Sequence, residues 1–77
     1  MQDQTFTLLV DNVPVDARAV PFKFNEETRF TVTINGSEYM FVFDTSIGRY
    51  AAIGDEAATL PDNLEVAVAD RLKTIVT

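Results

Sequence analysis

The chain has 77 residues, 47% of them hydrophobic, and a net charge of −6 from 12 acidic and 6 basic residues. This length allows one small domain, 1–77, whose thin core leaves little volume for a deep active site. The sequence contains no Cys and no His, which excludes disulfides, thiolate chemistry, and the commonest general base and metal ligand.

The chain opens with a predicted β-hairpin. Residues 6–10 are strand-like, residues 11–12 are a turn signal, and residues 13–17 form the second strand. A two-residue turn pairs Val10 with Val13. The apolar side chains then share one face of the hairpin: Phe6, Leu8, Val10, Val13, Val15 and Ala17. Because Pro14 cannot donate to a ladder, its strand is expected at an edge or broken.

Residues 19–24 also alternate, and Pro21 again indicates an edge position or a bend. A polar turn follows at residues 25–27. The clearest local signal is Asn35-Gly36 between two alternating runs, because a type I′ turn needs positive φ at both positions. The resulting register pairs residues on two faces. The largely aromatic face has Thr28 opposite Phe43, Phe30 opposite Phe41 and Val32 opposite Tyr39. The other face has Arg29 opposite Val42, Thr31 opposite Met40 and Thr33 opposite Glu38.

Residues 44–48 indicate a loop and residues 49–53 another short strand. The final segment then changes to a helical period, with Leu64, Val68, Leu72 and Ile75 recurring at three- and four-residue steps. We expect the helix to begin at Asp62, with a capping box to Glu65. Thr59 is an alternative N-cap one turn earlier.

The sequence therefore predicts an α+β fold. A meander of four or five antiparallel strands, built from β-hairpins, is followed by one C-terminal amphipathic helix that packs on one face of the sheet. One helix cannot cover two faces. We expect Met40, Val42 and Leu9 on the uncovered face, and these three residues form the predicted interaction face.

No motif points to catalysis, a metal or a cofactor. Ser37 and Ser46 lie in predicted loops, and no His is available to activate them. Asp44, Ser46 and Gly48 repeat part of a calcium-loop spacing, but the distal Glu is missing, so an Asx-type turn is the better interpretation of Asp44. The protein is therefore not expected to be an enzyme, and we expect no catalytic, cofactor-binding or metal-binding residues.

The acidic surface repels nucleic-acid backbones and anionic membranes, and no apolar run approaches the roughly 20 residues that a membrane span needs. With no signal sequence visible, a cytoplasmic location is predicted. The leading hypothesis is a non-enzymatic protein-interaction module that binds another protein or a second copy of itself. Two alternatives are an acidic protein that imitates nucleic acid to inhibit a basic protein, and a binder of a small ligand between helix and sheet near Tyr39 and Tyr50.

Overall fold

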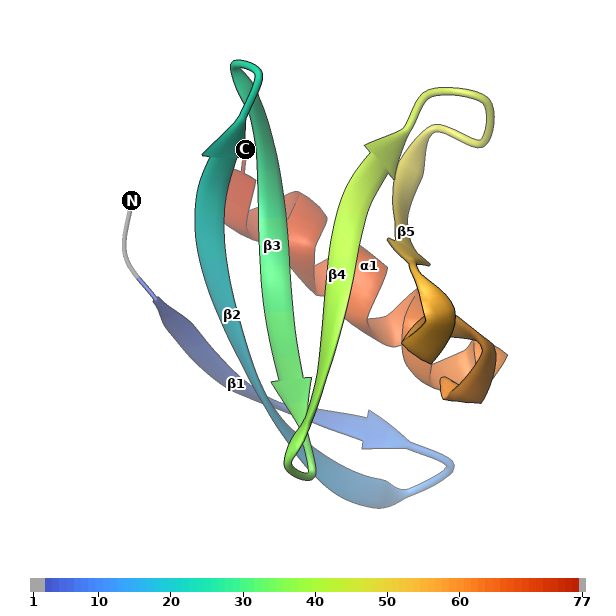
Figure 1. Ribbon diagram of the computed structural model, residues 1–77. Coiled ribbons are helices and arrows are strands. Elements are labelled where there is room, and N and C mark those ends of the chain that lie inside the picture. The colour runs from blue at the N-terminus through green and yellow to red at the C-terminus, as the bar shows by residue number, and fades with distance from the viewer. Residues whose placement is uncertain (1–2, 77) are drawn as a thin grey trace.

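The computed structural model describes residues 3–76. Its five strands form one antiparallel sheet in the order β1-β2-β3-β4-β5, so each strand pairs with the next in the chain (Figure 1). A 3-10 helix, η1, and one α-helix, α1, follow the sheet, which confirms the predicted α+β fold with five strands. The elements are β1 (Gln4–Val10), β2 (Val13–Phe24), β3 (Glu27–Ile34), β4 (Ser37–Asp44), β5 (Arg49–Ile53), η1 (Asp55–Thr59) and α1 (Asp62–Val76).

Three hairpin turns have the same conformation. Asp11-Asn12, Asn25-Glu26 and Asn35-Gly36 are two-residue connections in which both residues have positive φ. This is the type I′ geometry, whose twist matches that of the flanking strands. Asn, Asp and Gly tolerate the left-handed region, whereas Glu26, with φ 67°, is an unusual residue type there. The predicted hairpins at residues 11–12 and 35–36 are confirmed.

β2 is a single strand that continues past both prolines, where the sequence suggested an edge or a break. β1 pairs with residues 13–19 of β2, and β3 pairs with residues 17–24. Hydrogen bonding alternates outward from the pair that flanks each two-residue turn. By this alternation the nitrogen of Pro14 points to the β3 side of β2, at a position past the end of β3. The nitrogen of Pro21 points to the β1 side, at a position past the start of β1. Neither proline removes a ladder hydrogen bond, so the strand continues.

β3 and β4 pair in the predicted register from Ile34 opposite Ser37 to Phe30 opposite Phe41. The pairs predicted beyond Phe30, between residues 28 and 43 and between residues 29 and 42, are wrong. β3 remains with β2 and β4 with β5, and the two hairpins diverge (Figure 1). Two-stranded ribbons twist more strongly than wide sheets, which accounts for the divergence.

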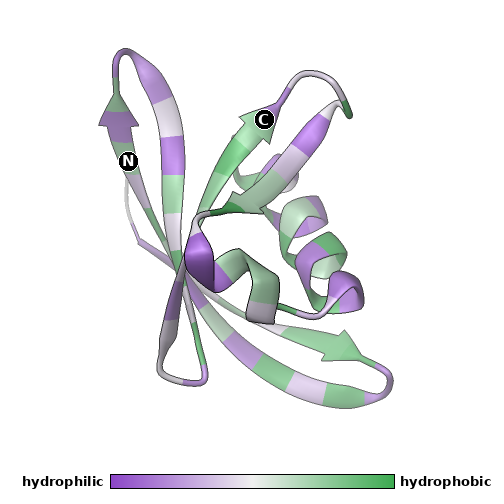
Figure 2. Cartoon of the chain, turned by 45° about the vertical axis from the view of Figure 1, so that its right-hand side comes forward, coloured by the Kyte–Doolittle hydropathy of each residue, from purple (hydrophilic) through white to green (hydrophobic). Residues whose placement is uncertain are grey.

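α1 packs along β5 and also contacts β1, so it spans the opening between the two ends of the curled sheet. Apolar and polar residues alternate along the strands (Figure 2), and the apolar residues that face α1 make the core. On α1, Val68 and Leu72 are fully buried, and Leu64 and Ile75 are partly buried around them. The buried residues are Phe6, Leu8, Ala17, Ala19, Phe30, Val32, Ile34, Phe41, Tyr50, Leu60, Val68, Ala69 and Leu72.

α1 begins at Asp62 as predicted, while Thr59 belongs to η1. The predicted capping box is wrong. The Glu65 carboxylate does not reach back to Asp62 but accepts a hydrogen bond from the Ala52 amide of β5, at 2.9 Å. An unpaired amide on a strand edge competes for this carboxylate, and sequence spacing within the helix does not reveal that competitor.

Candidate functional site

The sheet face that points away from α1 is its outer face. Register places residues of four strands in one row across this face: Val20, Thr31, Met40 and Ile53. In the next row Phe22 pairs with Arg29, and Val42 pairs with Ala51. We call the large apolar members of the two rows the outer apolar patch, which consists of Val20, Phe22, Met40, Val42 and Ile53.

A surface hollow of about 310 Å³ lies at the β4–β5 end of the patch. Met40 and Ile53 are register partners in it, with 38% and 39% of their surface exposed. Glu38 of β4 and Glu56 of η1 line the same hollow, together with Thr31 and Tyr39. The hollow therefore combines exposed apolar side chains with two carboxylates.

The structure brings together two of the three residues of the predicted interaction face. Met40 and Val42 both lie on the outer face, with Val42 half-buried. Leu9 is 73% exposed, but it lies opposite Pro14, six residues along β2 from Val20. That separation is roughly 20 Å at the rise of a β-strand. Leu9 is therefore not part of the outer apolar patch.

Sequence reasoning missed Val20, Phe22 and Ile53. The signal that places Val20 and Phe22 on the outer face is the two-residue turn at residues 25–26, which fixes how β2 pairs with β3. Asn25-Glu26 is a weaker hairpin signature than Asn35-Gly36, because Glu seldom adopts positive φ. Ile53 joins the patch only through the register of β4 with β5, which a four-residue loop sets.

Arg29 lies beside Phe22 at the other end of the patch. Its guanidinium carbon is 4.2 Å from the centroid of the Phe24 ring, and its Nη2 donates to Glu27 Oε2 at 3.5 Å. Only 21% of the Arg29 side chain is exposed, and its Nε is buried with no acceptor among the described residues. Arg29 and Glu27 give this end of the patch a charged border.

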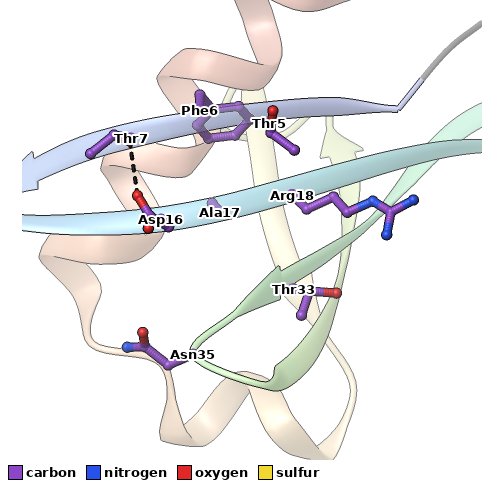
Figure 3. Close-up of a pocket in the computed structure, with 8 residues that line it drawn as sticks. All are labelled: Thr5, Phe6, Thr7, Asp16, Ala17, Arg18, Thr33 and Asn35. Carbon is purple, nitrogen blue, oxygen red and sulfur yellow. Dashed lines mark hydrogen bonds between the residues drawn. The ribbon is translucent and has the colours of Figure 1, made fainter.

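A polar hollow of about 520 Å³ lies further along the outer face, where β3 turns away from the β1–β2 hairpin (Figure 3). Thr7 Oγ1 donates to Asp16 Oδ1 at 2.9 Å, and Arg18 forms an ion pair with Asp3. Thr7, Asp16 and Arg18 therefore already have partners in the protein. The lining residues are Thr5, Phe6, Thr7, Asp16, Ala17, Arg18, Thr33 and Asn35.

Of the two tyrosines beside which the sequence predicts a small-ligand site as an alternative, Tyr39 lines the hollow at Met40 and Ile53, and Tyr50 packs against aromatic side chains. The Tyr50 ring makes edge-to-face contacts with Phe30 and Phe43, at centroid distances of 5.6 and 5.4 Å, and 6% of the residue is exposed. Burial raises the pKa of the Tyr50 hydroxyl, and the negative charge of Glu27 adds to the shift. Tyr50 is thus a core residue with a neutral hydroxyl.

The β4–β5 loop is an Asx turn, as the sequence indicates. The Ser46 hydroxyl and amide donate to Asp44 Oδ1 at 2.6 and 2.9 Å, and these hydrogen bonds lower the pKa of the Asp44 carboxyl. Across residues 3–76 no three His, Cys, Asp or Glu side chains gather in a way that suits a metal ion. Within the same range, no helix has the length and apolar character needed to cross a bilayer.

Comparison of the chain with known protein families, curated proteins and solved structures finds no match. The residues of the outer face and of the strand edges are therefore the basis on which a function is proposed.

Proposed function

We propose that the chain is a protein-interaction module that binds a protein partner through the outer apolar patch. The observation that carries the proposal is the hollow at Met40 and Ile53, where exposed apolar side chains lie beside the carboxylates of Glu38 and Glu56. Single exposed apolar residues are common on monomeric proteins, whereas contiguous exposed apolar patches are typical of interaction surfaces.

The chemistry of the hollow suits a basic, amphipathic segment of a partner. An apolar side chain would insert between Met40 and Ile53, and a Lys or Arg on either side of it would meet Glu38 and Glu56. The net charge of −6 supports this choice, because it accelerates encounters with basic proteins and disfavours acidic ones.

The alternative of a nucleic-acid mimic has less support. Such a protein needs its carboxylates gathered on one surface. Asp3 instead forms an ion pair with Arg18 on the β1–β2 hairpin, and Glu27 forms one with Arg29 on β3. Acidic and basic side chains are thus interleaved on the described surface, as is usual for solubility.

Titration with synthetic peptides tests the proposal. A peptide with one large apolar residue flanked by Lys is compared with the same peptide carrying Glu in place of Lys, and amide chemical shifts are followed. We expect only the basic peptide to bind, with shifts centred on Met40 and Ile53. Met40→Asp should weaken binding by about tenfold or more, while Leu9→Asp, on the distant hairpin, should change it by less than about twofold.

The same two variants serve as baits in purification from the native cell. We expect a partner that the wild type and Leu9→Asp retain to be lost with Met40→Asp. Equal binding of both peptides, or equal retention by both variants, would contradict the proposal.

A further inference from the structure

We propose that β1 is a dimerisation edge, at which a second copy of the chain pairs its own β1 in antiparallel orientation. β1 is an end strand of the sheet and is bonded to β2 alone. Val10 and Val13 flank the two-residue turn and form a hydrogen-bonded pair, so the alternation turns the N–H and C=O groups of Thr5, Thr7 and Leu9 outward. These three residues therefore present unpaired backbone N–H and C=O groups along the free edge of β1. The inference does not depend on the outer apolar patch.

Two other strand edges of the described sheet are protected. On β5 the Ala52 amide donates to the Glu65 carboxylate, and α1 lies along the strand. The part of β2 that extends past β1 carries Pro21, which has no N–H, and the charged residue Lys23. Proteins commonly blunt free edges in these ways because an open edge pairs with other strands.

β1 has neither a proline nor a carboxylate acceptor at the outward groups of its described residues, although α1 also contacts this strand. Its seven residues, Gln4–Val10, include no Pro, no Gly and no charged side chain, and their β-branched and aromatic residues favour an extended strand. An open strand edge of this length indicates a surface that binds a strand.

The sequence of β1 is complementary to itself. An antiparallel pair with its two-fold axis at Thr7 opposes Thr5 to Leu9 of the second copy, and Phe6 to Leu8 of the second copy. The outward groups of Thr5, Thr7 and Leu9 then all find partners in the ladder. Leu9, 73% exposed in the single chain, gains a neighbouring side chain across the interface.

The helix beside β1 suits the same symmetry. A hollow of about 330 Å³ between β1 and α1 is lined by Leu8, Ala67, Asp70, Arg71 and Thr74. A two-fold axis beside β1 brings the hollows of the two copies together. Each copy then offers one carboxylate, Asp70, and one guanidinium, Arg71, so opposite charges can pair across the axis. The small side chain of Ala67 leaves room for the approach.

Like charges meet only at the ends of the paired strands, where Asp3 would oppose Asp11 of the second copy. Both carboxylates already have partners within their own chain. Asp3 forms an ion pair with Arg18, and Asp11 accepts a hydrogen bond from Asn63 Nδ2 at 2.8 Å. The positive charge of Arg18 beside Asp3 reduces the repulsion between the two aspartates.

The first test uses the wild-type chain. Sedimentation between about 10 and 500 µM, the range of weak dimers, should show the mass rise from 8.6 kDa toward twice that value. Over the same range, hydrogen exchange at the amides of Thr5, Thr7 and Leu9 should slow by about tenfold or more. The Lys23 amide, which points outward on β2 beyond β1, is the matched control and should not change.

A mass that stays at 8.6 kDa throughout would overturn the proposal, even if the edge then accepted a foreign peptide. So would a dimer in which Thr5, Thr7 and Leu9 exchange as they do in the monomer. Neither result depends on a variant that has to fold.

The second test exploits the two-fold axis. Thr7→Glu places like charges directly opposite each other, with Asp16 beside each of them, so this variant alone should be monomeric. An equal mixture with Thr7→Lys should recover the dimer. Thr33→Lys adds the same charge on β3 and should dimerise like the wild type. Met40→Asp should also dimerise, so loss of peptide binding and loss of dimerisation are separate results. A Thr7→Glu chain that dimerises as tightly as the wild type would contradict the proposal.

Discussion

Phe30 and Phe41 lie opposite each other on β3 and β4 and have no exposed surface. Replacing Phe30 by Ala removes a large ring from the centre of the core, and the sheet cannot collapse into the space because α1 holds it open. We expect the free energy of unfolding to fall by about 3–5 kcal/mol, measured by urea denaturation. Phe24→Ala is the control: Phe24 is 49% exposed, and its loss should cost about 1 kcal/mol or less. Equal losses would contradict this picture of the core.

Asp44 has a pKa below its ordinary value because the Ser46 hydroxyl, and then the Ser46 amide, donate to its carboxylate. The folded pKa is thus lower than the unfolded one. The stabilisation is fully present above the unfolded pKa and is lost as the pH falls through the folded value. We expect Ser46→Ala to raise the Asp44 pKa toward its ordinary value in a carboxyl NMR titration. Ser37→Ala, at the start of β4, should leave it unchanged, and an unmoved Asp44 pKa in Ser46→Ala would contradict the assignment.

At the scale of the elements, the hairpin turns determine the register of the sheet. Gly36 has φ +82°, and a Cβ added there would meet no atom within 4 Å. The cost of Gly36→Ala is therefore conformational, and we expect about 1–2 kcal/mol of lost stability in urea denaturation. Asn35→Gly, at φ 52°, should be neutral or slightly stabilising because Gly adopts that conformation freely. A Gly36→Ala variant as stable as the wild type would mean that the turn is not type I′.

The contact between α1 and β5 includes the Glu65 carboxylate, which occupies the position that a neighbouring strand would take. Glu65→Ala leaves the Ala52 amide without an acceptor, and we expect a loss of about 1–3 kcal/mol. Hydrogen exchange at Ala52 should accelerate by more than global destabilisation explains. Glu56→Ala, an exposed carboxylate on η1, is the control, and unchanged exchange at Ala52 in Glu65→Ala would contradict the interpretation.

The elements that the sequence predicted best are those determined by neighbours in the chain. Asn35-Gly36 and Asp11-Asn12 fix their hairpins because the turn residues alone require the geometry. The capping box at Asp62 failed because Glu65 has a stronger competitor on a strand that is adjacent only in space. The predicted pairing of Arg29 with Val42 failed because twist separates the two hairpins, and twist accumulates over the whole sheet.

At the scale of the whole molecule, α1 packs on the core face of the sheet, and without it the core side chains of the sheet would be exposed to solvent. Val68 is fully buried on it, so Val68→Asp places an unpaired charge in the core. We expect the far-ultraviolet circular dichroism and the amide dispersion of all five strands to be lost together. Thr74→Asp, at an exposed position of the same helix, should cost about 1 kcal/mol or less. Retained dispersion in β1–β3 of Val68→Asp would show that the sheet folds without its helix.

The candidate site was predictable only in part, because local alternation shows which face a residue lies on but not how far apart two residues of that face are. Alternation places Met40 and Val42 on the outer face, and the local hairpin is enough to see it. Leu9 also points to the outer face, but it lies opposite Pro14, in the part of the β1–β2 hairpin that extends past the end of β3. Distance along a curled sheet depends on where each strand begins and ends, and the period of the sequence carries no such information.

The order of the strands also determines how the protein folds as it is made. Each hairpin joins sequence neighbours, so the sheet assembles through short loop closures, and we expect refolding on the order of milliseconds. During synthesis, however, the aromatic face emerges before α1, the segment that covers it. Until α1 leaves the ribosome, that face and the open β1 strand are both available to other chains. The nascent protein is therefore most prone to aggregation while α1 has still to emerge.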